Sequence, residues 1–243
     1  MILYGNCIRR RKAATTKRIR IFGDSILKGV IYDKSSDRYS LLENPPIIGL
    51  SQVYGLEIHN SSMFGSTISK GVQLLQRAIT RGLSCEIALV EFGGNDCDYP
   101  WAEIAKDPTG KFSPNTPLEL FGKTLQEMML TLKSQKIQPV LMTLPPIDSI
   151  RYLNHICRDG LNKEAILSWL HGDAQTIARF QELYSLKINE IAKETETVLI
   201  DIRSAFLQRR DYASLICADG IHPSREGHLL IASSFAEYLD THK

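Results

Sequence analysis

The feature that most constrains the fold is an alternation, along the chain, of short apolar runs with longer segments of helical periodicity. Apolar runs that end at glycine or proline predict strands, and apolar residues repeating every three to four positions predict amphipathic helices. Strand followed by helix, repeated in this way, favours a mostly parallel sheet with helices on both faces. The predicted strands cover 18–22, 56–59, 86–92, 138–144 and 197–202, and the predicted helices cover 66–81, 117–135, 174–195 and 226–239.

Two of the predicted connections are long. A strand-to-helix loop usually needs about two to six residues, and both 97–116 and 147–172 far exceed this. Both leave the carboxyl ends of strands, where parallel sheets keep their ligand sites. The segment 147–172 carries large apolar residues at partly helical spacing, so it is a candidate lid over the site. Packing on an outer helix or on a second subunit is the alternative.

The first segment that carries chemistry is Gly23-Asp24-Ser25-Ile26, directly after the first predicted strand. The glycine allows a sharp turn, and the serine then stands at the start of a helix. A helix N-terminus favours negative charge that develops there during a reaction. Asp and Ser after a strand also commonly do no more than cap a helix. This segment alone leaves both interpretations open.

A base for this serine is offered by the segment Asp219-Gly220-Ile221-His222-Pro223, just before the last predicted helix. A serine hydroxyl is a poor nucleophile until a base takes its proton. Histidine does this near neutral pH, and a carboxylate fixes its tautomer. We therefore predict that one ring nitrogen of His222 lies within hydrogen-bond reach of Ser25 Oγ. The other ring nitrogen should face Asp219.

Two further segments offer N–H donors for an anion. Gly93-Gly94-Asn95-Asp96 ends the third predicted strand, and an amide beside glycines that allow close approach suits an oxyanion hole. A plain turn is the alternative for that segment. Phe64-Gly65-Ser66 follows the second predicted strand, and its glycine offers a backbone N–H.

Candidate substrate-binding residues follow the Asn95 segment along the chain. Large side chains there can line a pocket, or they can pack the loop onto the body of the protein. A further candidate comes from the segment 147–172. The candidates are Asp98, Tyr99, Trp101 and Trp169.

Together these segments resemble the SGNH hydrolase family, also called GDSL esterases and lipases. The resemblance covers about residues 18–240, with all four sequence blocks present and in order; Ile26 stands where leucine is usual. It implies a flavodoxin-like three-layer α/β/α sandwich with about five parallel strands. It implies neither a metal nor an organic cofactor.

The resemblance also implies roles for individual residues. Ser25 would attack the acyl carbon, and His222 would act first as base and then as acid. Asp219 would orient His222. The backbone N–H groups of Ser25 and Gly65, with the side-chain amide of Asn95, would form the oxyanion hole.

Several other chemistries find no support in the sequence. The Gly-x-Ser-x-Gly elbow of ordinary α/β-hydrolases is absent, as are the glycine patterns of nucleotide-binding loops. His222 and His228 could suggest a metal pair, but His228 is predicted to lie down the last helix, away from the site. Five scattered cysteines without a Cys-x-x-Cys pair predict neither a disulfide framework nor a structural zinc site.

Chain length and net charge limit the number of domains and the kinds of partner that the sequence predicts. The 243 residues suit one domain, predicted over 18–243, after a basic leader over 1–17 that we expect to be solvated. A net charge of +2 is too small to indicate nucleic acid as the main partner. We find no secretory signal and no apolar run long enough to span a membrane, so we expect a cytoplasmic protein. The sequence leaves the oligomeric state open.

Three functions from different classes follow. The first is hydrolysis of small or medium acyl esters, with a small molecule or an O-acetylated carbohydrate as substrate. The second is acyl transfer through the same acyl-enzyme, with an alcohol in place of water. The third is a binding domain without catalysis, which the intact set of Ser25, Asn95, Asp219 and His222 disfavours.

Overall fold

The computed structural model describes residues 16–242 and contains a five-stranded sheet. Its strand order is β4-β1-β5-β6-β7, and every neighbouring pair is parallel. This confirms the predicted fold class and the predicted strands. The strands are β1 (Arg18–Phe22), β4 (Glu57–Asn60), β5 (Ile87–Val90), β6 (Gln138–Met142) and β7 (Val198–Ile200).

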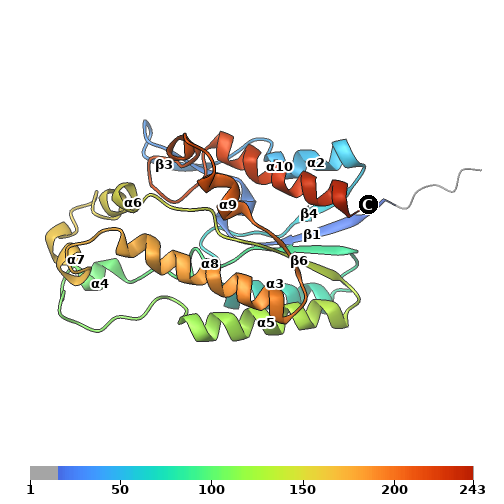
Figure 1. Cartoon of the computed structure of the whole chain (residues 1–243), viewed down its shortest axis with the longest axis horizontal. Coiled ribbons are helices and arrows are strands. Elements are labelled where there is room, and N and C mark those ends of the chain that lie inside the picture. Colours follow the sequence, from blue (N-terminus) through green and yellow to red (C-terminus); the bar gives the residue numbers. More distant parts are fainter. Residues whose placement is uncertain (1–15, 243) are drawn as a thin grey trace, which may run out of the picture.

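Helices cover both faces of this sheet and give the three-layer α/β/α sandwich (Figure 1). One apolar core joins the sheet to the first group of helices, and a second core joins its other face to the second group. The first group is α3 (Ile68–Thr80), α5 (Leu118–Ser134) and α8 (Thr176–Glu194); the second is α2 (Pro46–Tyr54), α9 (Ile202–Leu207) and α10 (Arg225–Thr241).

Strands β5, β6 and β7 are mostly apolar because each one contributes side chains to both cores. Successive side chains of a strand point to opposite faces of the sheet. In β5, Ala88 and Val90 therefore enter the core beside α3 and α5, whereas Ile87 and Leu89 enter the core beside α10. Burial on both faces explains why these strands are continuous apolar runs.

The two long connections form a third apolar core beyond the carboxyl ends of the strands, at the left of Figure 1. They are helical in part, and their helices pack on one another and on the start of α8. The helices are α4 (Trp101–Ile104) in the first connection and α6 (Ser149–Ile156) and α7 (Lys163–Trp169) in the second.

Helices α2, α4 and α9 were not predicted from the sequence. Nor was an antiparallel hairpin of β2 (Val30–Asp33) and β3 (Arg38–Leu41). The hairpin follows the short helix α1 (Ser25–Lys28). A 3₁₀ helix, η1 (Tyr212–Leu215), precedes the loop that leads into α10.

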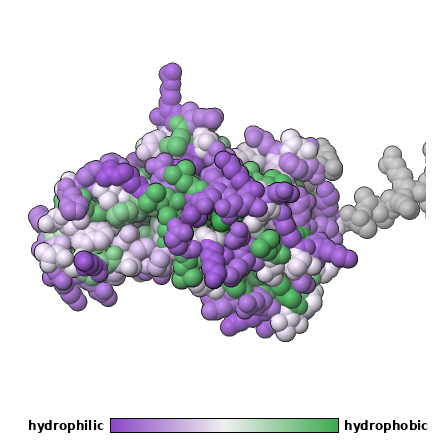
Figure 2. Space-filling view, turned by 60° about the horizontal axis from the view of Figure 1, so that its bottom comes forward, coloured by the Kyte–Doolittle hydropathy of each residue, from purple (hydrophilic) through white to green (hydrophobic). Residues whose placement is uncertain are grey.

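The surface carries both hydrophilic and hydrophobic residues. Figure 2 shows hydrophilic residues over much of one face, with hydrophobic residues gathered in smaller areas between them. No helix within residues 16–242 is long and apolar enough to cross a membrane. Residues 1–15, and with them most of the predicted basic leader, lie outside the described part of the chain.

Candidate active site

The turn after β1 brings Ser25 to the carboxyl edge of the sheet. Asp24 caps helix α1, because its carboxylate accepts a hydrogen bond of 2.8 Å from the Ile26 N–H. Ser25 is the first residue of that helix and lines a cavity. At Gly23, a Cβ atom would come within 3.1 Å of Ser62 Oγ and 3.2 Å of the Glu91 carbonyl oxygen. The segment therefore does both things that the sequence left open, since it caps a helix and presents a serine.

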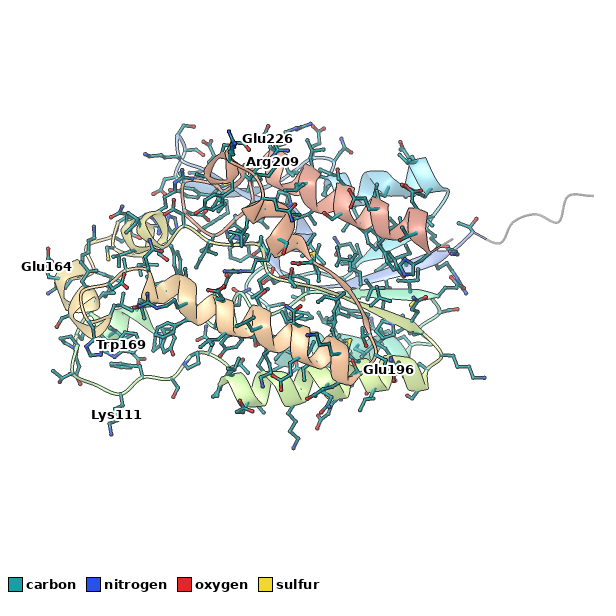
Figure 3. All side chains as sticks on the ribbon, viewed as in Figure 1. Lys111, Glu164, Trp169, Glu196, Arg209 and Glu226 are labelled. Carbon is teal, nitrogen blue, oxygen red and sulfur yellow. The ribbon has the colours of Figure 1, made fainter. Side chains whose placement is uncertain are left out.

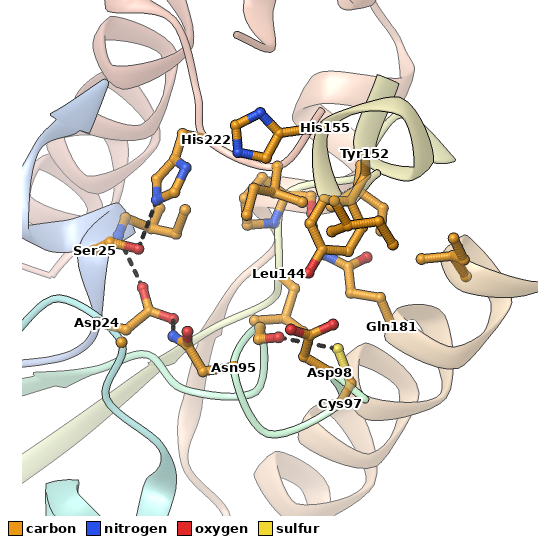
Figure 4. Close-up of a pocket in the computed structure, with 18 of the residues that line it drawn as sticks. Asp24, Ser25, Asn95, Cys97, Asp98, Leu144, Tyr152, His155, Gln181 and His222 are labelled. Atoms are coloured by element: carbon orange, nitrogen blue, oxygen red, sulfur yellow. Dashed lines mark hydrogen bonds between the residues drawn. The ribbon is translucent and has the colours of Figure 1, made fainter. Parts of the chain in front are cut away.

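His222 joins Ser25 to Asp219. Its Nε2 lies 2.9 Å from Ser25 Oγ (Figure 4). Its Nδ1 lies 2.6 Å from Asp219 Oδ2. The second Asp219 oxygen accepts from the backbone N–H groups of His222, at 3.2 Å, and Ile221, at 3.3 Å. All three side chains are buried; Ser25 keeps 5% of its surface and His222 keeps 3%. The side chains thus form one hydrogen-bonded chain from a buried carboxylate to a hydroxyl at the cavity wall.

The loop that carries this pair is held tightly. Gly220 has a φ of 84°, and a Cβ atom there would lie 2.5 Å from the Asp148 carbonyl oxygen and from the Tyr152 nitrogen. The Gly220 carbonyl oxygen in turn accepts from the Asp148 N–H at 2.8 Å. The start of α6 and the Asp219–His222 loop are therefore fixed against one another.

Aromatic rings enclose the imidazole of His222. Phe64 stacks on it, with ring centroids 6.0 Å apart and an interplanar angle of 12°. Tyr39 meets it edge-on at 5.1 Å. Tyr39 belongs to β3 and was missed by the sequence analysis, which did not predict the hairpin.

Gly65 and Asn95 also line the cavity. Gly65 has a φ of 68°, a conformation that favours glycine. The side-chain amide of Asn95 donates to Asp24 Oδ2 at 2.9 Å and to the Ser66 carbonyl oxygen at 3.2 Å. In this structure, the amide that the family resemblance assigns to the oxyanion is thus bonded to protein acceptors.

A second carboxyl group lies behind Asp24. Glu91 follows β5, is 1% exposed, and lies 3.4 Å from the Asp24 N–H through its Oε2. Burial, together with the neighbouring Asp24 carboxylate, raises the pKa of Glu91 well above its ordinary value. Burial also raises the pKa of Asp24, but donors from Ile26 and Asn95 favour its charged form. We infer that Glu91 holds the proton and Asp24 holds the charge. The sequence analysis missed Glu91, whose only signal was a carboxyl group inside an apolar run.

Asp96 connects the Asn95 turn to the first turn of α3. Both of its carboxylate oxygens accept from the Ile68 N–H at 3.1 Å. Burial raises the pKa of Asp96 to about 6. Its role in the structure is to fix the Asn95 turn against the helix that follows Gly65.

The cavity beside Ser25 has a volume of about 320 Å³ and extends from the carboxyl edge of the sheet toward α6 and α8. Most of its wall is apolar or aromatic, and none of the described residues that line it is Lys or Arg. Pockets for small molecules commonly begin at about this size. Its apolar wall includes Trp101, Leu144, Ile147, Tyr152, Ile156, Ile177, Phe180 and Ile221.

The four predicted substrate-binding residues separate into two pairs. Asp98 and Trp101 line the cavity, and Asp98 Oδ1 accepts from Trp101 Nε1 at 2.7 Å. Tyr99 and Trp169 are not among the lining residues; their rings pack on one another at 5.1 Å behind the wall. Trp169 lies in the lobe of α4, α6 and α7, at the same end of the molecule as Lys111 (Figure 3).

The mouth of the cavity is crossed by a contact between the hairpin and α6. Tyr39 Oη lies 2.8 Å from His155 Nε2. Burial lowers the pKa of His155 and raises that of Tyr39, so the neutral imidazole accepts and the hydroxyl donates. Arg158 and Asp37 form an ion pair of 3.5 Å between the same two segments. His155 had no visible partner in the sequence, because its partner lies on the unpredicted hairpin.

No group of three or more His, Cys, Asp and Glu side chains within 16–242 is arranged to hold a metal ion. His228 instead bonds the Val30 carbonyl oxygen at 3.0 Å. Burial lowers its pKa to about 4.

The model of the GDSL-like Lipase/Acylhydrolase family matches residues 21–230 of the chain. The chain belongs to this family. The printed name of the family is that of lipases and acylhydrolases. Family membership also agrees with the resemblance found in the four sequence blocks.

Two GDSL esterase/lipase proteins of plants are similar in sequence. The one from Oryza sativa subsp. japonica is 26% identical over 63% of this chain and 53% of its own length. The one from Arabidopsis thaliana is 23% identical over 75% of this chain and 67% of its own length. The chain thus spans about half the length of the rice protein.

Solved structures show the same fold. A lipase/acylhydrolase from Enterococcus faecalis has a TM-score of 0.66 at 18% identity, covering 93% of this chain and 97% of that one. A variant of an acetyl-xylooligosaccharide esterase from Geobacillus Stearmophilus has a TM-score of 0.59 at 20% identity, covering 91% and 93%. At these identities the likeness supports the fold of the GDSL family.

Proposed function

We propose that the protein is a serine esterase that hydrolyses small or medium acyl esters through an acyl-enzyme on Ser25. The observation that carries this proposal is the hydrogen-bonded chain from Asp219 through His222 to Ser25, which ends at the wall of an apolar cavity. A nucleophile, a base that reaches it and a group that orients the base are what acyl transfer requires.

In the first half of the reaction, His222 Nε2 takes the proton of Ser25 Oγ as the oxygen attacks the acyl carbon. The carbonyl electron pair moves to oxygen and gives a tetrahedral oxyanion. Asp219 stabilises the imidazolium that has formed. The bond to the alcohol oxygen then breaks, that oxygen takes the proton from Nε2, and the alcohol leaves behind an ester of Ser25.

In the second half of the reaction, water hydrolyses the acyl-enzyme. His222 Nε2 takes a proton from a water molecule as the water oxygen attacks the acyl carbon of the Ser25 ester. Collapse of this second oxyanion breaks the bond to Oγ, and the proton on Nε2 passes to that oxygen. The products are a carboxylic acid and free Ser25, so the atoms and protons balance.

The oxyanion would be held by the N–H groups of Ser25 and Gly65 and by the Asn95 amide. Within residues 16–242, the backbone N–H groups of Ser25 and Gly65 donate to no protein acceptor. The Asn95 amide is already bonded to Asp24 and to Ser66. It would have to exchange one of these bonds, and the 3.2 Å bond to the Ser66 oxygen is the longer of the two.

The substrate would be an uncharged ester. The cavity wall offers apolar surface and the Asp98 carboxyl group, without a Lys or Arg among the described lining residues to bind an acidic acyl group. The acetyl-xylooligosaccharide esterase among the structural neighbours makes O-acetylated carbohydrates a candidate class. An acyltransferase would use the same acyl-enzyme and differ only in the acceptor.

The test is a set of p-nitrophenyl esters of increasing chain length together with acetylated xylo-oligosaccharides, assayed on purified protein. Ser25→Ala should remove activity, since loss of such a nucleophile costs on the order of a million-fold in kcat in the proteases. Ser69→Ala, on the exposed face of α3, is the matched control. Retention of more than about a tenth of the rate by a folded Ser25→Ala variant contradicts the proposal.

The acceptor is tested in the same assay. Added glycerol or methanol competes with water for the acyl-enzyme. Free acid as the main product supports a hydrolase. Ester products that outweigh free acid at low alcohol concentration support the acyltransferase.

A further inference from the structure

A second cavity, of about 460 Å³, lies at the other end of the sheet from Ser25. It is bounded by the first residues of β1 and β4, by the last turns of α3 and by the loop that leads into β5. In Figure 1 this is the right-hand end, where β1 begins. The charged and ionisable residues of its wall are Arg18, Arg20, Glu57, His59, Arg77, Arg81 and Cys85.

Arg20 is the unusual residue of this wall. It lies in the middle of β1 on the same face as Phe22, and its Cζ is 5.8 Å from the Phe22 ring centroid. Its Nε is buried and has no hydrogen-bond partner. Burial lowers the pKa of Arg20, with no carboxylate to oppose the effect. The aromatic face offsets part of the cost of this partial burial, but a guanidinium whose Nε is buried without an acceptor is suited to an anionic partner.

Its neighbours add positive charge and do not neutralise it. Arg77, in the last turn of α3, and Arg81, which caps that helix, are exposed, and neither forms an ion pair within residues 16–242. His59 lies opposite Arg20 in the β1–β4 register, and its pKa is lowered by burial and by the charge of Arg20. Arg18 is paired with Glu86 at 2.7 Å. Among the described residues of the wall, only Glu57 carries a carboxylate. The wall also holds three guanidinium groups without an ion-pair partner, those of Arg20, Arg77 and Arg81.

We propose that this cavity binds a phosphate-bearing small molecule or headgroup. Guanidinium groups bind phosphate through two parallel hydrogen bonds, and a phosphate can accept from several of them at once. A ligand with a single carboxylate in place of the phosphate would pair with only one of the three guanidinium groups. The rest of the wall includes Leu74, Ala78 and Leu83, which offer apolar surface to an organic group attached to the phosphate.

The test uses inorganic pyrophosphate as the soluble probe and phosphatidylcholine vesicles with 20% phosphatidate as the lipid probe. Isothermal titration should show one pyrophosphate per chain, with affinity that falls as salt rises. Arg77→Gln and Arg81→Gln change exposed residues at the end of α3. Each should weaken binding by roughly tenfold, as loss of a hydrogen bond to a charged group does. Lys70→Gln, on the same helix but outside the cavity, is the control and should bind like the wild type.

Arg20→Met removes the partly buried cation, and circular dichroism checks that this variant is folded. The proposal is overturned if the wild type binds neither probe, or if Arg77→Gln and Arg81→Gln both bind like Lys70→Gln. Binding to vesicles alone assigns the site to a lipid headgroup, and binding to pyrophosphate alone assigns it to a soluble phosphate ester. Ser25→Ala should bind as the wild type does, so this result is independent of the proposed esterase activity.

Discussion

The reactivity proposed for Ser25 would depend on how firmly the imidazole of His222 is held. Its Nδ1 is bonded to Asp219, its face is covered by Phe64 and its edge meets Tyr39. A ring held in this way keeps Nε2 directed at Ser25 Oγ before substrate arrives. Such preorganisation avoids the entropic cost of finding the reactive geometry in each turnover.

The contribution of Asp219 is open to a direct test. Asp219→Asn keeps the size of the side chain. Its amide favours the His222 tautomer in which Nε2 already carries a proton, so that Nε2 does not accept the proton of Ser25. We expect kcat on p-nitrophenyl acetate to fall by about 10⁴-fold, judged from the corresponding substitution in serine proteases. Asp211→Asn, on an exposed loop, is the control. An unchanged kcat for Asp219→Asn would show that the carboxylate does not orient His222.

Asn95 should act on the rate rather than on binding. Its amide would meet the oxyanion mainly in the transition state, so Asn95→Ala should lower kcat by about 10²–10³ and leave KM similar. Steady-state kinetics separate the two constants. A raised KM with kcat preserved would instead make Asn95 a residue that binds the ground-state ester.

Glu91 should make stability depend on pH. Its pKa is raised in the folded chain, so the folded state holds more protons than the unfolded state above the ordinary glutamate value of 4.5. Stability contributed by this group is therefore full below that value and falls as pH rises toward the folded pKa. Glu91→Gln keeps a neutral donor beside Asp24 and removes the titration.

Urea unfolding at pH 5 and pH 8 tests this expectation. From pH 5 to pH 8, the free energy of unfolding should fall more for the wild type than for Glu91→Gln. The Glu91→Gln variant should keep most of the esterase activity. Equal pH dependence of the two proteins would mean that Glu91 is already ionised in the fold.

At the scale of helices and strands, what the sequence reveals depends on burial. Strands β5, β6 and β7 were predictable because both of their faces are buried and their runs are mostly apolar. Strand β1 was predictable because polar and apolar residues alternate along it before the turn at Gly23. The β2–β3 hairpin was not, because every residue of β3 is exposed and no alternation marks it. Tyr39, and with it the partner of His155, was therefore invisible in the sequence.

The candidate site was predictable to a similar extent. Short segments at strand ends pointed to Ser25, His222 and Asp219, and the structure brings these three side chains together; their catalytic roles stay predictions. Sequence spacing could not show that Asn95 is bonded to Asp24, because that contact joins the ends of two strands. Nor could it show that Trp169 lies behind the cavity wall, since this depends on how α7 packs on α4.

The segment 147–172 should set acyl size through α6. Ile156 lines the cavity, whereas Trp169 belongs to the aromatic cluster behind it. Ile156→Ala should raise kcat/KM for p-nitrophenyl octanoate relative to acetate, because the cavity gains the volume of the lost side chain. Trp169→Ala should lower the melting temperature and leave that ratio unchanged. A shift in the ratio with Trp169→Ala alone would show that α7, and not α6, controls the substrate.

At the scale of the whole molecule, the site joins parts that are far apart in the chain. Ser25 and His222 are separated by 197 positions, and the mouth is crossed by a bond between Tyr39 and His155, 116 positions apart. The sheet brings the strand ends together, and the hairpin and α6 then meet above them. The hydrogen bond between Tyr39 and His155 is therefore separate from those that join Ser25, His222 and Asp219, although the Tyr39 ring also meets His222.

That separation predicts that the entrance can be altered without loss of chemistry. Tyr39→Phe removes the bond to His155 and keeps the ring beside His222, at a cost of about 1 kcal/mol in stability. We expect kcat/KM for p-nitrophenyl acetate to change little. For an acetate ester of a bulky alcohol it should rise a few-fold, because the hairpin can move away from α6. His155→Leu should have the same effect, and the double variant should add nothing further, since both changes break one bond. Additive effects of the two substitutions would show that each residue acts on the substrate by itself and that no closure joins the hairpin to α6.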